Sequence, residues 1–166
     1  MSDSDLMERA LAQARLCLEE GAMPIGAVLA CKGEIIAEAY WRGLERGLLR
    51  HPEHEVLIEA DRSMTWEQRR ESTLYTTLEP CLMCMGTAMS FFLGRIVYAL
   101  AAPADGAVNV LDQWRPVLGH PEAAGPYALP RIEGGVAESE SRALVASWLA
   151  TGVTGAEADF ASRTLR

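Results

Sequence analysis

Cys81 and Cys84 are the side chains of this sequence best suited to chemistry, because two thiols lie three residues apart beside a predicted helix. Pro80 comes just before them, and an apolar stretch, residues 85–89, follows. Proline suits the turn before a helix, since its ring fixes φ and it has no N–H. A helix N-terminus stabilises a thiolate, and the thiolate is the form of cysteine that binds zinc. A C-x-x-C pair alone fits a redox pair or two small buried side chains equally well.

A histidine and a glutamate upstream strengthen the zinc interpretation. His51 and Glu53 form an H-x-E motif that precedes the P-C-x-x-C motif by about thirty residues. Together the two motifs resemble the signature of the zinc-dependent nucleobase deaminases. Residues 23–29, 74–81 and 93–98 also resemble segments of bacterial tRNA-adenosine deaminases and of guanine or cytosine deaminases, in the same order. By this resemblance the chain is identified as a member of the cytidine/deoxycytidylate-deaminase-like superfamily.

The resemblance implies a complete catalytic site. Zinc is held by His51, Cys81 and Cys84, and Glu53 carries protons without binding the metal. Four further residues are expected to contact the substrate: Ala27 through its backbone, Trp41, Glu79 and Pro80. Relatives of this kind have an asparagine before the histidine that hydrogen-bonds the substrate, and this sequence has none between Ala39 and His51. That departure leaves purine versus pyrimidine open.

The run His-Pro-Glu-His-Glu-Val, residues 51–56, admits a second register. His54 is an alternative metal ligand, but Val56 would then occupy the position of the glutamate and hydrolysis should fail. Glu55 is an alternative proton carrier, but Glu53 would then take the ligand position. Both histidines together with the two cysteines would instead close a four-ligand site that is purely structural, since catalysis needs an open position for water.

The pattern of apolar residues predicts the elements that position these side chains. Apolar residues at helical spacing predict helices, and short apolar runs bounded by turns predict strands. Helices are expected from Asp5 to about residue 20 with a capping box formed by Asp5 and Glu8, and over 52–62, 81–91 and 139–149; strands over 25–31, 35–40, 73–78, 95–100 and 132–136. This alternation, like the resemblance, indicates an α/β fold, a three-layer α/β/α sandwich with a mixed central sheet.

The expected organisation is one deaminase domain, residues 1–150, and a tail, 151–166, that either covers the site, as in guanine deaminases, or frays. The third histidine, His120, has no partner at ligand spacing and is expected to lie in a loop.

Composition bounds the functions that fit. The 166 residues are 49% hydrophobic, with 15 basic and 23 acidic residues, a net charge of −8 and Lys32 as the only lysine. The chain shows neither an apolar run long enough to cross a membrane nor a secretory signal, so we expect a cytoplasmic protein with reduced cysteines. A negative net charge does not suit a grip on phosphates, so nucleic acid is an unlikely partner.

The sequence therefore predicts a zinc-dependent hydrolytic deaminase of a small amino-heterocycle, a free nucleobase or nucleoside. Two alternatives are a tRNA adenosine (A-to-I) deaminase and an inactive zinc-binding homologue. The resemblance also implies a homodimer.

Overall fold

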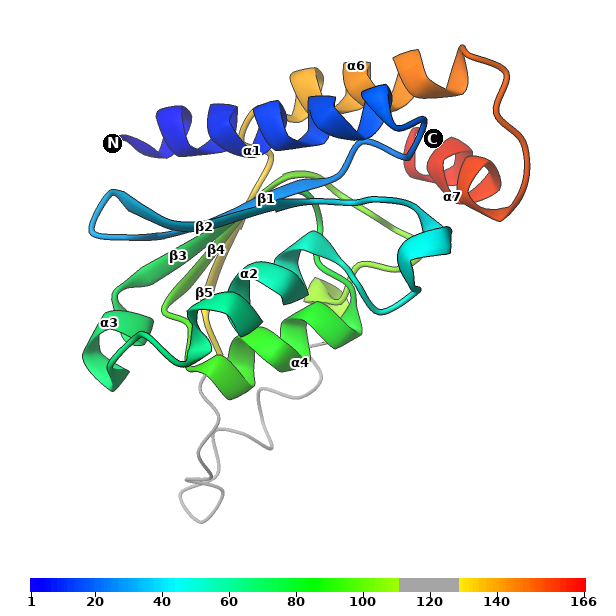
Figure 1. Cartoon of the computed structure of the whole chain (residues 1–166). Helices are drawn as coiled ribbons and strands as arrows, with labels where there is room; N and C mark the ends of the chain where they lie inside the picture. The colour runs from blue at the N-terminus through cyan, green and yellow to red at the C-terminus, as the bar shows by residue number, and fades with distance from the viewer. Residues whose placement is uncertain (111–128) are drawn as a thin grey trace.

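A five-stranded sheet lies at the centre of the molecule, between two layers of helices (Figure 1). The structure, a computed structural model, describes residues 1–110 and 129–166. The strand order is β2-β1-β3-β4-β5. The strands are β1 (Gly26–Cys31), β2 (Glu34–Tyr40), β3 (Ser72–Leu78), β4 (Arg95–Leu100) and β5 (Arg131–Gly134). β1 pairs antiparallel with β2 and β3, whereas β3, β4 and β5 run parallel, so the predicted mixed sheet is confirmed.

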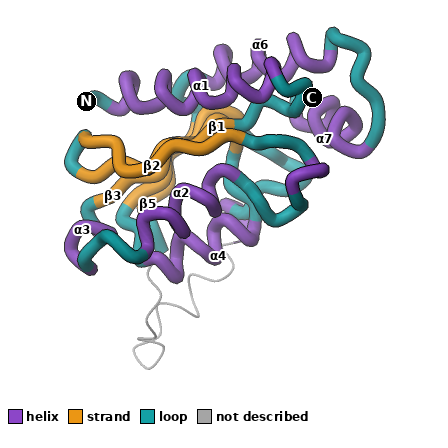
Figure 2. Tube along the Cα trace, in the orientation of Figure 1, coloured by secondary structure: helices purple, strands orange, loops and turns teal. Residues whose placement is uncertain are grey.

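The helices divide between the two faces of the sheet. α2 and α4 cover one face, and α1 and α6 cover the other, where α7 lies beside α6 (Figures 1 and 2). Their bounds are α1 (Asp3–Glu19), α2 (Pro52–Asp61), α3 (Trp66–Arg70), α4 (Leu82–Phe91), α6 (Glu138–Leu149) and α7 (Ala156–Thr164), with a 3₁₀ turn η1 at Leu44–Arg46. The predicted three-layer sandwich is confirmed.

α1 begins earlier than its predicted capping box. Ser2 is the N-cap: its hydroxyl accepts a hydrogen bond from the backbone N–H of Asp5, whose carboxylate in turn accepts from the N–H of Ser2. The prediction that Asp5 and Glu8 form the box was therefore wrong, because serine three residues before an acidic side chain makes the same reciprocal bonds.

Each face of the sheet buries a layer of apolar side chains. Between the sheet and the α2–α4 layer, Leu29, Val56, Leu74, Met85 and Ile96 are fully excluded from solvent. The runs 26–31 and 73–78 are buried almost throughout because helices cover both of their faces, which explains why they read as continuous apolar stretches. The sheet is thus a rigid platform whose β3 end leads directly into Cys81.

The C-terminal segment forms a helix that packs against the fold. In α7, Ala158 and Ala161 are buried, in a cluster that includes Trp41 and Trp148. His120, by contrast, lies outside the described residues. Among the described residues, none of the helices has the length and apolar character to cross a membrane.

Candidate active site

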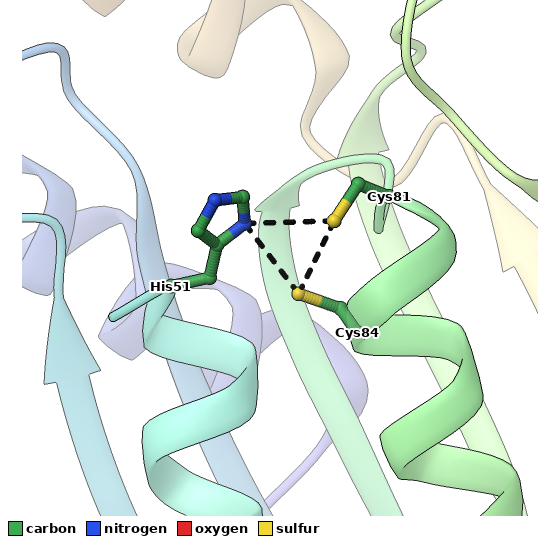
Figure 3. A group of neighbouring side chains, drawn as sticks. All are labelled: His51, Cys81 and Cys84. Carbon is green, nitrogen blue, oxygen red and sulfur yellow. Dashed lines mark hydrogen bonds between the residues drawn. The ribbon is translucent and has the colours of Figure 1, made fainter. Parts of the chain in front are cut away.

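Two helix N-termini meet at one edge of the sheet and bring three metal-binding side chains together. His51 is the N-cap of α2 and Cys81 is the N-cap of α4, with Cys84 in the first turn of α4. The Nδ1 atom of His51 lies 3.6 Å from each sulfur, and the two sulfurs are 3.6 Å apart (Figure 3). The three side chains form a nearly equilateral triangle.

This triangle fits a zinc ion. Tetrahedral zinc binds sulfur at about 2.3 Å and nitrogen at about 2.0–2.1 Å, which places neighbouring ligand atoms about 3.5–3.8 Å apart. One imidazole and two thiolates leave the fourth position free, as in catalytic zinc sites. In the part of the chain that the structure describes, His51, Cys81 and Cys84 are the sole group of this kind.

The other histidine of the motif lies elsewhere. The Nδ1 atom of His54 is 3.1 Å from the carbonyl oxygen of Leu49, and Glu55 pairs with Arg50. The structure therefore does not bring His54 to the thiols, and it does not assemble the four-ligand site. In the alternative register, His54 would be the metal ligand and Glu55 the proton carrier, but neither residue belongs to the group of metal-binding side chains.

The three ligands polarise one another. The hydrogen bond between Cys81 and Cys84 lowers the pKa of Cys81 to about 4, with a further contribution from His51. The same bond, together with burial, raises the pKa of Cys84. The pKa of His51 is raised, mainly by its hydrogen bond to Cys81.

Glu53 is buried beside the triangle. Its side chain is only 3% exposed; Oε2 lies 3.7 Å from the sulfur of Cys84, and Oε1 accepts a hydrogen bond of 2.9 Å from the hydroxyl of Thr76. Burial raises the pKa of Glu53. Thr76 was not singled out from the sequence, because a threonine in a strand gives no signal of its partner. It holds one carboxylate oxygen and leaves the other facing the metal ligands.

Three of the predicted substrate contacts serve the framework of the site. The carboxylate of Glu79 accepts hydrogen bonds from the backbone N–H groups of Ala102 and Val108, and the carbonyl of Pro80 accepts one from Ala107. These bonds fasten the loop after β4 to the segment that leads into Cys81. The side chain of Ala27 is buried in the core. Their contact with substrate stays a prediction.

A cavity of about 270 Å³ adjoins the metal site at His51. Its lining is Met23, Ile25, Trp41, Leu44, Leu48, His51, Pro52, Ala156, Glu157 and Phe160. Trp41 packs its ring edge-on to His51, with 5.4 Å between ring centroids, and its indole Nε1 donates to Oε1 of Glu157 over 2.7 Å. The cavity wall thus combines the loop before α2 with α7, two segments that are distant in the sequence.

Residues 1–100 match the family model described as the cytidine and deoxycytidylate deaminase zinc-binding region. The chain belongs to this deaminase family. Its sequence is 36% identical over 110 residues to a tRNA-specific adenosine deaminase of Bacillus subtilis, covering 66% of this chain and 68% of that protein. It is 34% identical over 138 residues to the tRNA-specific adenosine deaminase of Agrobacterium fabrum, covering 81% of this chain and 86% of the relative.

A solved structure extends the likeness to the whole fold of this deaminase. It comes from work on A-to-I editing by tRNA:A34 deaminases at the wobble position of transfer RNA, and it is 33% identical with a TM-score of 0.68, over 84% of this chain and 98% of that one. The deaminase is therefore a zinc-binding protein of the predicted superfamily, with His51, Cys81 and Cys84 placed to bind the metal.

Proposed function

We propose that this deaminase hydrolyses adenosine to inosine in tRNA. Three comparisons support this substrate: two relatives named as tRNA-specific adenosine deaminases and a structure from the tRNA:A34 deaminases, each more than 30% identical to the chain. The observation that carries the chemistry is the buried carboxylate of Glu53, with one oxygen 3.7 Å from a predicted metal ligand. The relatives named as tRNA deaminases count against our expectation that nucleic acid is an unlikely partner.

In the proposed reaction, Glu53 moves the protons. His51, Cys81 and Cys84 would hold the zinc ion, which would supply the Lewis acidity that makes water a nucleophile at neutral pH. Oε2 of Glu53 accepts the proton of the attacking water and passes it to the ring nitrogen beside the amino-bearing carbon. It then passes the second proton to the departing amino group, which leaves as ammonia, while the carbon becomes a carbonyl. Thr76 holds Oε1 throughout, so the free oxygen stays aimed at the reacting atoms.

The negative net charge does not prevent contact with RNA at the site, because charge is distributed locally. The loop before α2 carries Arg42 and Arg46 beside the cavity-lining residues Leu44 and Leu48. Neither arginine has a carboxylate within 4 Å among the described residues, whereas Arg50 is paired with Glu55. A guanidinium group without a carboxylate partner favours phosphate, although that of Arg42 also lies over the ring of Tyr40, 4.8 Å from its centroid.

A second candidate is the deamination of a free base or nucleoside. The cavity favours it, because apolar side chains dominate its wall and α7 encloses one side. A planar uncharged heterocycle fits such a wall better than a phosphate does. The segment 151–166 would then act as a cover over the site.

One experiment separates these functions. The zinc-loaded protein is given tRNA, with inosine measured, and a panel of purine and pyrimidine bases and nucleosides, with ammonia measured. We expect inosine. Ammonia from the panel alone would favour the second candidate, and neither product would indicate an inactive zinc-binding homologue.

Substitution of Glu53 tests the assignment of the proton carrier. Glu53→Gln should retain zinc and lower kcat by at least about 100-fold, since general acid–base catalysis contributes about 10²–10⁴. Glu55→Gln, the matched control two residues further, should retain activity. Full activity of Glu53→Gln, or equal losses in both variants, would contradict the assignment.

A further inference from the structure

The cavity beside His51 has one acidic group in its wall. Of its ten lining residues, eight are apolar, and the remaining two are His51 and Glu157. Glu157 lies in the first turn of α7, and its side chain is half-buried. A carboxylate against an apolar wall needs hydrogen-bond donors, because burial without them is costly.

The structure supplies this carboxylate with one donor. Oε1 of Glu157 accepts the indole N–H of Trp41, which is itself 5% exposed and packs edge-on to His51. Among the described residues, no hydrogen bond reaches Oε2 of Glu157. The hydrogen bond from Trp41 therefore fixes the orientation of the carboxylate and leaves Oε2 able to accept a hydrogen bond.

We propose that Glu157 is the specificity-determining residue of this deaminase, accepting a hydrogen bond from an uncharged N–H or O–H donor of the substrate. The inference rests on the proposed deamination but goes beyond it, because it assigns a recognition role to α7. A phosphate is disfavoured at this end of the cavity, since the carboxylate of Glu157 places negative charge in its wall. The part of the substrate that enters must be neutral and must bring its own proton.

Two parts of the proposed substrates carry such a donor. In tRNA, the ribose of the target adenosine offers its 2′-hydroxyl, which is a donor as well as an acceptor. In a free purine, the ring N–H that a sugar would replace offers the same contact. The chemistry that Glu157 recognises is shared, and the two sources can be separated by substrates that lack one donor or the other.

The test compares Glu157→Gln with Asp159→Asn in the zinc-loaded protein. Both variants remove one negative charge from the same turn of α7, but Asp159 is exposed and does not line the cavity. Glu157→Gln should raise KM, and the Kd measured by titration, by about tenfold or more, the usual effect of losing a hydrogen bond to a charged group. Its kcat should change much less, and Asp159→Asn should match the wild type.

The donor is identified with paired substrates. One pair is an anticodon stem–loop RNA with adenosine or 2′-deoxyadenosine at the target position, and the other is a free purine and its nucleoside. In one of the two pairs, the wild type should prefer the member that has the donor over the member that lacks it. Glu157→Gln should lose that preference. Trp41→Phe, which keeps an aromatic ring but removes the indole N–H, should weaken the preference, because the carboxylate of Glu157 stays in the wall but loses the bond that orients it.

Several results would overturn the inference. These are an unchanged KM and Kd in Glu157→Gln, equal increases in both charge variants, or a wild type that prefers neither member of either pair. A wild type that binds these ligands but turns none over would remove the proposed function alone, because the Kd comparison still tests Glu157.

Discussion

At the scale of single residues, backbone position decides which histidine faces the thiols. His51 has extended backbone angles, φ −64° and ψ 138°, as the N-cap of α2, and its ring turns toward Cys81 and Cys84. His54 lies within the helix, three residues further, and contacts the Leu49 carbonyl instead. Two side chains three positions apart share a helix face only if both are helical. Here one of them is not.

This difference predicts opposite behaviour of two alanine variants. His51→Ala removes one of the three predicted metal ligands and should weaken zinc binding by more than about 100-fold, since even residues that only orient a ligand contribute about 10–100-fold. His54→Ala should bind zinc as the wild type does. Zinc content after dialysis against a chelator measures both. Loss of zinc in His54→Ala with retention in His51→Ala would reverse the register.

At the scale of elements, glycines set how closely helices approach the sheet. A Cβ atom on Gly26, at the start of β1, would lie 2.2 Å from the carbonyl oxygen of Ala10 and 2.5 Å from the backbone nitrogen of Ala14. Both neighbours are backbone atoms of α1, so they cannot rotate away. By contrast, a Cβ on Gly86 in α4 would meet no atom within 4 Å.

Alanine at these two glycines should therefore change stability in opposite directions. Gly26→Ala should lower the free energy of unfolding by about 1–3 kcal/mol, because α1 must move off the sheet. Gly86→Ala should raise it by about 0.5–1 kcal/mol, since alanine is the better helix former and the space is open. Urea denaturation measures both. A neutral Gly26→Ala would show that the contact between α1 and β1 is not as close as described, and a destabilised Gly86→Ala would show that the space beside Gly86 is not open.

At the scale of the whole molecule, one ionic network joins the first helix to the last strands. The guanidinium of Arg95 in β4 donates to both carboxylate oxygens of Asp3, over 2.9 and 2.7 Å, and to Glu133 in β5. The hydroxyl of Tyr75 in β3 also donates to Asp3. Segments that are distant in the sequence are thus fastened together on the α1 side of the sheet.

The network predicts an acid-sensitive part of the stability. The hydrogen bond to Arg95, and then the one to Tyr75, hold the pKa of Asp3 below its ordinary value of 3.8. Because the folded state favours ionised Asp3, its contribution is fully present above that ordinary value and is lost as the pH falls through the lowered pKa. Asp3→Asn should be less stable than the wild type at pH 7, and the difference should shrink below about pH 4.

Urea denaturation at a series of pH values measures this convergence. A constant difference between wild type and Asp3→Asn across the acid range would mean that Asp3 ionises equally in both states. The Glu8–Arg15 pair, in which both side chains are half-exposed, offers the control. Glu8→Gln should change the free energy of unfolding by no more than about 1 kcal/mol at either pH.

The sequence by itself determined the fold and the pair of thiols. H-x-E and P-C-x-x-C are local patterns, and the apolar periodicity of residues 26–31, 73–78 and 95–100 requires a sheet buried on both faces. A homodimer stays a prediction. The relatives favoured the tRNA substrate, whereas the net charge did not. Net charge is a sum over the whole chain, so it does not show where the arginines lie.

Only the tertiary structure decided how the site is surrounded. The choice of His51 depended on where α2 begins, and the framework role of Glu79 depended on amides 23 and 29 residues away. The bond between Trp41 and Glu157 joins residues 116 positions apart. Such contacts arise when packed elements bring distant backbone into register, and neither side chain carries a local signal of its partner. Each helix or strand depends on a local pattern of residues, whereas the cavity depends on how the helices and strands pack.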